Sequence, residues 1–209
     1  MKTVLLFDFD GTLADSIPVV VDSFRDAFRE LSAPYPGDDA IRAQIGKHLQ
    51  DIFSDFLPEK SVEKAVKAYR KHYLARQNRG GIHLFPGVRD AISSLAQKGY
   101  QMGVVTTKLA AFTQPLLDNL SLSPYFSCLV GAEDVTHCKP HPEPLLLASK
   151  RMNVSPDACA YIGDSVHDAQ AATAANMTFM GVLTGAASIN QLQQYGRVFA
   201  DIREMEKIL

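Results

Sequence analysis

The chain is poor in cysteine, in long apolar runs and in excess charge of either sign. Its three cysteines form an odd set without metal-ligand spacing, which predicts reduced thiols rather than a disulfide framework. No apolar stretch approaches the length of a membrane span, and acids break the first apolar run too early for a signal peptide. A net charge of −2 over 209 residues gives no electrostatic bias towards nucleic acid. We therefore expect a cytoplasmic globular protein that has neither nucleic acid nor membrane as a partner.

The first apolar run ends abruptly in two carboxylates. Residues 4–7 have the length and composition of a buried strand, and Asp8 and Asp10 follow with one residue between them. Because side chains alternate along a strand, both carboxylates start on the same side, and Gly11 allows a sharp exit. Two acids at the mouth of a buried strand are costly unless a positive group lies there. A hard divalent cation such as Mg²⁺ is the simplest such group, and a strand that merely ends in a polar turn is the alternative.

From residue 84 onward, strand-like and helical patterns alternate, which predicts a parallel sheet covered by helices on both faces. Residues 15–80 show no convincing strand and have helical patterns instead. We therefore predict an α/β fold in which a Rossmann-like parallel sheet core, residues 1–14 and 84–209, carries an inserted all-helical domain, residues 15–83. The later strands are expected at 101–106, 128–130, 158–162 and 178–183, and helices at 16–31, 38–48, 49–57, 59–77, 87–98, 111–120, 143–152 and 168–175.

Polar residues stand at the ends of the later strands, where ligands bind in open α/β sheets. Thr106 would offer a hydroxyl to a phosphate oxygen, and Pro140 and Pro142 stiffen the backbone around Lys139. Asp164 and Asp168 straddle a strand-to-helix turn. The negative charge of four carboxylates, of Asp8, Asp10, Asp164 and Asp168, exceeds the positive charge of Lys139, so the site by itself would repel a phosphate dianion. The residues therefore imply both a divalent cation and a proton on one acid, Asp10.

Together these motifs resemble those of the haloacid dehalogenase-like superfamily of phosphohydrolases. Their order along the chain is Asp-x-Asp-Gly-Thr, Thr, Lys-Pro and Gly-Asp-x-x-x-Asp, each at a predicted strand end. The resemblance covers essentially the whole chain, and the insert looks like the small helical cap of these enzymes. Phosphoglycolate phosphatases and their near relatives are the most similar subgroup, on the evidence of residues 139–144 and 181–185. Thr107 departs from the pattern, since many relatives are expected to have Asn there.

The resemblance implies a Mg²⁺-dependent phosphatase that acts on a small phosphorylated metabolite through an aspartyl-phosphate. Asp8 would be the nucleophile, and Asp10 would protonate the leaving alcohol and then activate water. Magnesium would be held by Asp8, the backbone carbonyl of Asp10 and Asp164, with Asp168 in direct or indirect contact. Thr106 and Lys139 would hold the phosphoryl oxygens. The further substrate contacts expected in the core are Gly11, Thr12, Thr107 and Lys108.

In the insert, the segment Ile45–His48 is the candidate for substrate specificity. Gly46 permits a close approach, and the polar Lys47 and His48 that follow would contact substrate; an exposed helix junction is an equally good reading. His167 lies inside the acidic loop of the core, where it would tune that loop. The basic side chains of residues 64–79 look like a solvated helix face: Lys64, Lys67, Arg70, Lys71, Arg76 and Arg79.

The motifs leave the substrate open, because one core chemistry serves many phosphate esters. A phosphoglycolate-like monoester is the favoured substrate. An inorganic pyrophosphatase and a sugar-phosphate mutase are the enzyme alternatives, and a non-catalytic binding or regulatory protein on the same fold is the remote one. A phosphonate hydrolase is disfavoured because it would typically need another residue at Asp10. The expected oligomeric state is a monomer or a homodimer.

Overall fold

A six-stranded parallel sheet is the centre of the fold. The description is of residues 4–209 of a computed structural model. The strand order is β5-β4-β1-β6-β7-β8, so β1 is a central strand. The strands that come next along the chain, β4 and β5, lie on one side of β1, and the later strands β6, β7 and β8 lie on the other side. Such a reversal of strand order is where open α/β sheets bind ligands. The strands are β1 (Val4–Phe7), β4 (Met102–Val105), β5 (Cys128–Val130), β6 (Cys159–Gly163), β7 (Thr178–Val182) and β8 (Arg197–Phe199).

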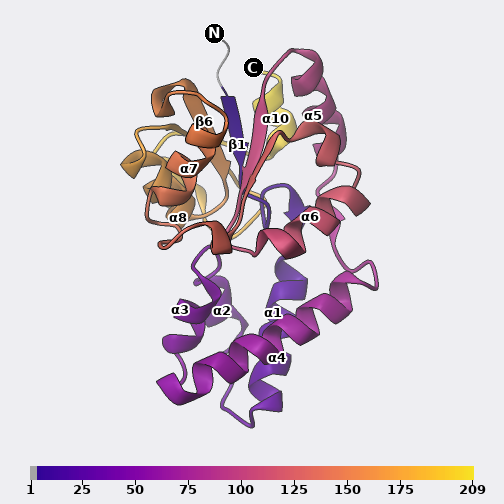
Figure 1. Cartoon of the computed structure of the whole chain (residues 1–209), viewed down its shortest axis with the longest axis vertical. Coiled ribbons are helices and arrows are strands. Elements are labelled where there is room, and N and C mark those ends of the chain that lie inside the picture. Colours follow the sequence, from indigo (N-terminus) through magenta and orange to yellow (C-terminus); the bar gives the residue numbers. More distant parts are fainter. Residues whose placement is uncertain (1–3) are drawn as a thin grey trace.

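Alternate residues of the strands pack on opposite faces of the sheet. In β1, Leu5 and Phe7 belong to one buried cluster, and Val4 and Leu6 belong to a second cluster. Helices cover both faces, as Figure 1 shows, and this explains why the central strands β1, β4 and β6 are buried along their whole length. The first cluster packs under α5 (Val88–Gln97), α6 (Ala110–Asn119) and α10 (Ile202–Glu206), and the second under α7 (Glu143–Arg151), α8 (Val166–Ala174) and α9 (Ile189–Leu192).

The helical insert forms a separate lobe below the carboxyl ends of the strands, and the start of β1 and the C-terminus lie at the opposite end of the molecule (Figure 1). Aromatic rings hold its helices together: Phe24 of α1 lies 4.9 Å from the Phe53 ring and 4.6 Å from the Tyr69 ring, measured between centroids. An ion pair of 2.5 Å between Asp26 and Arg76 also joins α1 to α4. The helices are α1 (Ile17–Glu30), α2 (Asp38–Arg42), α3 (Leu49–Ser54) and α4 (Glu59–Gln77).

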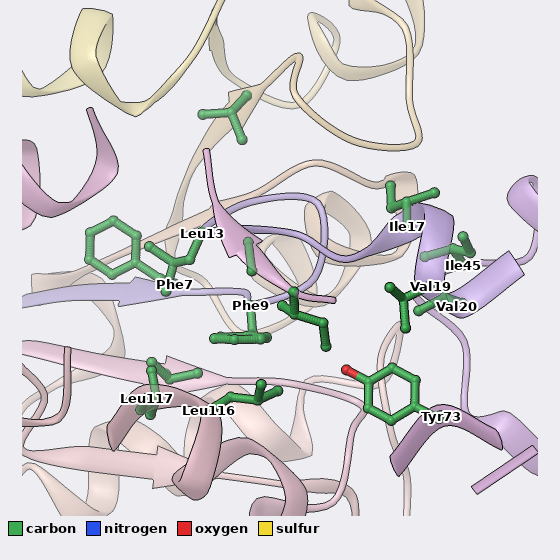
Figure 2. Close-up of a cluster of buried hydrophobic side chains, with 14 of the residues drawn as sticks. Phe7, Phe9, Leu13, Ile17, Val19, Val20, Ile45, Tyr73, Leu116 and Leu117 are labelled. Atoms are coloured by element: carbon green, nitrogen blue, oxygen red, sulfur yellow. The ribbon is translucent and has the colours of Figure 1, made fainter. Parts of the chain in front are cut away.

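A short antiparallel ribbon joins the helical lobe to the sheet. In this ribbon β2 (Ala14–Asp15) pairs with β3 (His83–Leu84), so the chain enters and leaves the lobe side by side. The first hydrophobic cluster is continuous across this junction. Figure 2 shows Phe9, at the end of β1, in one cluster with Val20, Ile45 and Tyr73 of the insert.

The predicted α/β fold with a helical insert is confirmed, and the predicted strands and most of the helices lie where the sequence places them. Two helices are shorter than predicted: α2 ends at Arg42 and α3 at Ser54. Between them Gly46 has a φ of +103°, which is incompatible with helix. The elements that the sequence analysis missed are short, namely β2, β3, β8, α9, α10 and the 3₁₀ turns Ser123–Tyr125, Ala132–Asp134 and Pro156–Ala158. Among residues 4–209, no helix is long and apolar enough to cross a membrane.

Candidate active site

The central strands bring three acids together. Asp8 follows β1, and its N–H group donates a 2.8 Å hydrogen bond to Ile162 of β6, which fixes Asp8 beside the end of that strand. Asp164 directly follows β6, and Asp168 lies on the first turn of α8. All three are buried, and each offers a carboxylate oxygen within 4.8 Å of the others.

Lys139 is the buried cation of this cluster. Its ammonium group lies 3.0 Å from Asp8 and 2.6 Å from Asp168, and it donates a 2.8 Å hydrogen bond to the Tyr161 hydroxyl. Burial works against the charge on Lys139, but the carboxylates of Asp168 and Asp8 outweigh burial and hold its pKa above the usual value. Lys139 is therefore a fixed positive charge between two of the acids.

One ammonium does not offset three buried carboxylates. Burial raises the pKa of Asp8 well above its ordinary value, and repulsion by Asp168 and Asp164 adds to the rise while Lys139 opposes it. Burial likewise raises the pKa of Asp164 to about 7, and the Asp168 carboxylate contributes. The cluster thus strongly favours an additional positive charge. Its hard oxygen donors fit a divalent cation such as Mg²⁺.

The Asp164 carboxylate is held tightly from two sides. It accepts a 2.8 Å hydrogen bond from the Thr12 hydroxyl and another of 2.8 Å from the Ala186 N–H group. Gly11 and Gly185 lie directly against it. A Cβ atom on Gly11 would lie 2.5 Å from a carboxylate oxygen, and a Cβ atom on Gly185 would lie 1.8 Å from one. Only glycine fits at these two positions, so the backbone fixes this carboxylate in one orientation.

The Asp168 carboxylate is occupied by hydrogen bonds within the core. One oxygen accepts from Lys139 and Tyr161, and the other accepts from the Ser165 N–H group at 3.0 Å and the Ser165 hydroxyl at 2.6 Å. Ser165 is also the N-cap of α8, and it accepts a hydrogen bond from the Asp168 N–H group. The spacing Ser-x-x-Asp at a helix start could have revealed this capping box in the sequence.

A second lysine lies at Asp10. Lys108 forms a 2.6 Å ion pair with Asp10, and both side chains are largely buried. The Lys108 ammonium also contacts the hydroxyl of Tyr73, on α4, and lies 4.4 Å from the centroid of its ring. The Ser16 hydroxyl donates to the same oxygen of Asp10. Lys108 is a second, largely buried cation of the site, in addition to the Lys139 that the sequence indicated.

A cavity of about 80 Å³ separates the helical lobe from these carboxylates. Several residues predicted from the sequence line it, from both sides: Asp8, Asp10, Thr107, Lys108 and Asp164 of the core, and Lys47 and His48 of the insert. The other predicted residues are buried beside the cavity: Gly11, Thr12, Thr106, Lys139 and Asp168. The Thr106 hydroxyl accepts a 3.2 Å hydrogen bond from the Lys108 N–H group, and so it stabilises the turn that carries Lys108.

The segment Ile45–His48 reaches the core directly. A Cβ atom on Gly46 would lie 2.8 Å from the Ser165 hydroxyl and 3.3 Å from the His167 ring, so only glycine allows this approach. Lys47 lines the cavity, but its ammonium group forms a 3.1 Å ion pair with Asp55 of the insert. The segment is therefore a contact between the two lobes rather than an exposed helix junction.

Helix α4 supplies a wall of the cavity that the sequence analysis missed. Tyr69, Arg70 and Tyr73 all line the cavity. The prediction of a solvated basic face is wrong for Arg70, which is only partly exposed, and for Arg76, which pairs with Asp26. Alternating charged and aromatic residues on one long helix do not reveal which face meets another lobe, and no other signal in the sequence marked Arg70.

Comparisons with known proteins agree with this geometry. The model of the haloacid dehalogenase-like hydrolase family matches residues 5–182. The chain is 36% identical over 200 residues to "Probable phosphatase IndB" of Dickeya dadantii, covering 92% of this chain and 86% of that protein. It is 34% identical over 202 residues to the phosphoglycolate phosphatase of Escherichia coli K12, covering 86% and 80%. A hydrolase of Pseudomonas syringae has the same fold, with a TM-score of 0.89, 25% identity, and coverage of 99% and 97%. The chain is a member of the haloacid dehalogenase-like hydrolase family.

Proposed function

We propose that the protein is a Mg²⁺-dependent phosphatase that hydrolyses a small phosphorylated metabolite, a phosphoglycolate-like monoester, through an aspartyl-phosphate. The observation that carries the proposal is the position of Asp8. Its carboxylate ends the central strand, lines the cavity, and lies 3.0 Å from Lys139. A buried carboxylate next to a fixed ammonium and facing a cavity is suited to attack phosphorus.

The Asp8 carboxylate forms a bond to phosphorus while the bond between phosphorus and the ester oxygen breaks. Asp10, which lines the same cavity, gives its proton to that oxygen and releases the alcohol. Asp10 then takes a proton from water as the water oxygen attacks the aspartyl-phosphate. This second step releases inorganic phosphate and restores both carboxyl groups. Lys108 and Ser16 hold Asp10 in place for both proton transfers.

Residues that bind the cation follow from the hydrogen-bond pattern. Asp8, Asp164 and the backbone carbonyl of Asp10 would hold Mg²⁺, which when bound offsets the charge of the phosphoryl group. Each oxygen of Asp168 accepts two hydrogen bonds, whereas each oxygen of Asp164 accepts only one and keeps a lone pair for a cation. The role of Asp168 is therefore to orient Lys139 and to cap α8. Thr107 and the backbone around Thr106 would contact phosphoryl oxygens together with Lys139.

The ribbon of β2 and β3 supports the division of the chain into two domains. Residues 1–14 and 84–209 would form the catalytic core, and residues 15–83 would form the cap that closes the cavity against water. The two curated relatives described above carry names that denote phosphatases, and one is a phosphoglycolate phosphatase. Their names support the reaction class that we propose.

The test is a screen of phosphate esters with the purified wild type and Asp8→Asn, with and without Mg²⁺. The panel contains 2-phosphoglycolate, other hydroxy-acid phosphates, glucose 1-phosphate and inorganic pyrophosphate. We expect Mg²⁺-dependent phosphate release from a monoester, and a loss of at least about 100-fold in Asp8→Asn because an amide is a poor nucleophile. The melting temperature of Asp8→Asn in metal-free buffer should equal or exceed that of the wild type, because one buried charge is removed. Undiminished turnover by this variant, or turnover confined to pyrophosphate, contradicts the proposal.

A further inference from the structure

The part of the cavity away from the carboxylates is apolar. Its cap side is made of aromatic and aliphatic side chains from α1, α3 and α4, among them Phe24, Ile52 and Tyr69. Its core side adds Leu109 and Phe112, at the start of α6. Such a lining is typical of a site that binds an apolar ligand group and uses only a few polar side chains to orient it.

Leu109 and Phe112 stand out within this lining. Both are partly exposed, and neither belongs to the buried clusters that fill the core of residues 4–209. An aromatic and a branched aliphatic side chain that face a cavity would be stabilised by contact with an apolar group of a ligand. A leaving group such as glycolate, whose only apolar group is one methylene, offers these side chains little apolar contact.

The polar groups of the cavity differ in whether they already have a partner. Lys47 pairs with Asp55, and Lys108 pairs with Asp10. In the part of the chain that the structure describes, Arg70 has neither an ion-pair nor a hydrogen-bond partner, although it is only partly exposed. An arginine without a partner, at the edge of an apolar cavity, is suited to bind a carboxylate in a bidentate manner.

We propose, resting on the proposed phosphatase function, that the substrate is the phosphate ester of a hydroxy acid with an apolar or aromatic substituent. The phosphoryl group lies at Asp8. The apolar substituent lies between Phe112 and Tyr69, and the carboxylate pairs with Arg70. This assigns Arg70 and Phe112 as specificity-determining residues. Such a substrate shares the carboxylate of 2-phosphoglycolate and differs from it by the apolar substituent.

The experiment compares three probes: the phosphate ester of 3-phenyllactate, 2-phenylethyl phosphate, which lacks the carboxylate, and 2-phosphoglycolate, which lacks the ring. Each is measured by kcat/KM with the wild type, Arg70→Gln, Phe112→Ala and Lys67→Gln. Lys67 is the matched control, because it is an exposed cation on the same helix that does not contribute to the cavity. Calorimetric Kd values with Asp8→Asn report binding without turnover.

We expect the wild type to prefer phenyllactate phosphate over each of the other probes by at least about tenfold in kcat/KM. Arg70→Gln should lose about 10-fold to 100-fold on the two carboxylates and much less on phenylethyl phosphate. Phe112→Ala should lose more on the two ring-bearing probes than on 2-phosphoglycolate, and Lys67→Gln should behave as the wild type. The Kd values should follow the same order of preference.

Two outcomes overturn the inference while the phosphatase function stands: a preference for 2-phosphoglycolate, or equal losses on all three probes in Arg70→Gln. The measurements also identify the opposite case, in which the proposed reaction is wrong and the inferred ligand class is right. If none of the probes is hydrolysed but Asp8→Asn binds phenyllactate phosphate most tightly, the proposed reaction is wrong and the inferred ligand class stands. Absence of both turnover and binding for all three probes overturns both proposals.

Discussion

At the scale of single residues, the site depends on how each carboxylate is held. Asp164 and Asp168 are both buried acids of one loop, but their neighbours differ. Asp164 accepts hydrogen bonds from neutral groups, Thr12 and the Ala186 backbone, whereas Asp168 is paired with the Lys139 ammonium. A carboxylate without a protein cation is the better ligand for a metal ion, and one already paired is the better anchor for a lysine.

Asp164→Ala should therefore weaken Mg²⁺ binding by at least about tenfold, because a small cation held by few carboxylates loses much when one is removed. The measurement is a calorimetric Mg²⁺ titration, repeated as phosphate release against Mg²⁺ concentration. Asp157→Ala, which changes an exposed acid before β6, is the control. An unchanged Mg²⁺ affinity in Asp164→Ala would remove this residue from the metal site.

At the scale of elements, Gly46 shows how a single residue sets the distance between cap and core. Gly46→Ala places a methyl group against the Ser165 hydroxyl and requires a left-handed backbone that alanine disfavours. We expect a decrease of about 10-fold or more in kcat/KM, because the segment can no longer approach the core. Gly37→Ala is a suitable control: its φ is also positive, at +101°, but no atom lies within 4 Å of its position for a Cβ. Equal effects of the two substitutions would indicate backbone strain alone.

The packing of α1 against α4 predicts an acid-sensitive cap. The hydrogen bond from Arg76 holds the pKa of Asp26 below its ordinary value, with burial opposing it. A carboxyl whose pKa is lowered by folding stabilises the protein above its unfolded pKa of about 3.9, and this contribution disappears as the pH falls through the folded value. Asp26→Asn should thus lower the free energy of unfolding by about 0.5–1 kcal/mol at pH 7.

The difference between Asp26→Asn and the wild type should shrink as the pH falls below the unfolded pKa of about 3.9, and it should vanish once the pH has passed through the lower folded pKa of Asp26, where the wild-type carboxyl is neutral as well. Urea denaturation at a series of pH values measures it. Glu63→Gln, at an exposed position of α4, should show no such pH-dependent difference. A difference that persists unchanged at low pH would mean that Asp26 acts through packing rather than through charge.

The elements also show what could be predicted from the sequence. Helix α4 lies over Glu59–Gln77, as its pattern predicts, since a long amphipathic period is a strong signal. The ribbon of β2 and β3 has only two residues in each strand, so no alternation can reveal it. The helix predicted over 38–48 overlooked the effect of Gly46, whose positive φ depends on contact with the core. Sequence patterns therefore predicted the elements whose conformation depends on neighbouring residues, and they missed those that depend on contacts with distant parts of the chain.

At the scale of the whole molecule, the acids of the site were predictable and their partners were not. Asp8 and Asp164 follow strands whose ends must meet in a parallel sheet, so the sequence predicts their proximity. Lys108 contacts Tyr73 across the interface between cap and core, and Arg70 lines the cavity there, so their positions depend on how the two lobes pack. Residues 73 and 108 are separated by several elements, and no spacing rule relates them.

Tyr73→Phe tests this interface while retaining the ring that packs under Lys108. The substitution removes only the hydroxyl that contacts the ammonium, so closure of the cap over the core should become less favourable by about 1 kcal/mol. We expect kcat/KM to fall several-fold, and amide hydrogen exchange to rise in α4 but not in the central strands. Tyr125→Phe, at a partly exposed position of the core, is the control. Faster exchange throughout the sheet would indicate general destabilisation instead.

The pairing of Asp15 with His83 has a consequence for how such a chain can change over time. Because the two crossings between the lobes are adjacent in one ribbon, everything between them can be replaced as a single cassette whose ends already meet. A tight turn joining Asp15 to His83 would leave every strand of the six-stranded sheet, and the acids at its edge, in their present connectivity. The choice of substrate can then evolve by exchange of one segment, while the residues that act on phosphorus are inherited unchanged.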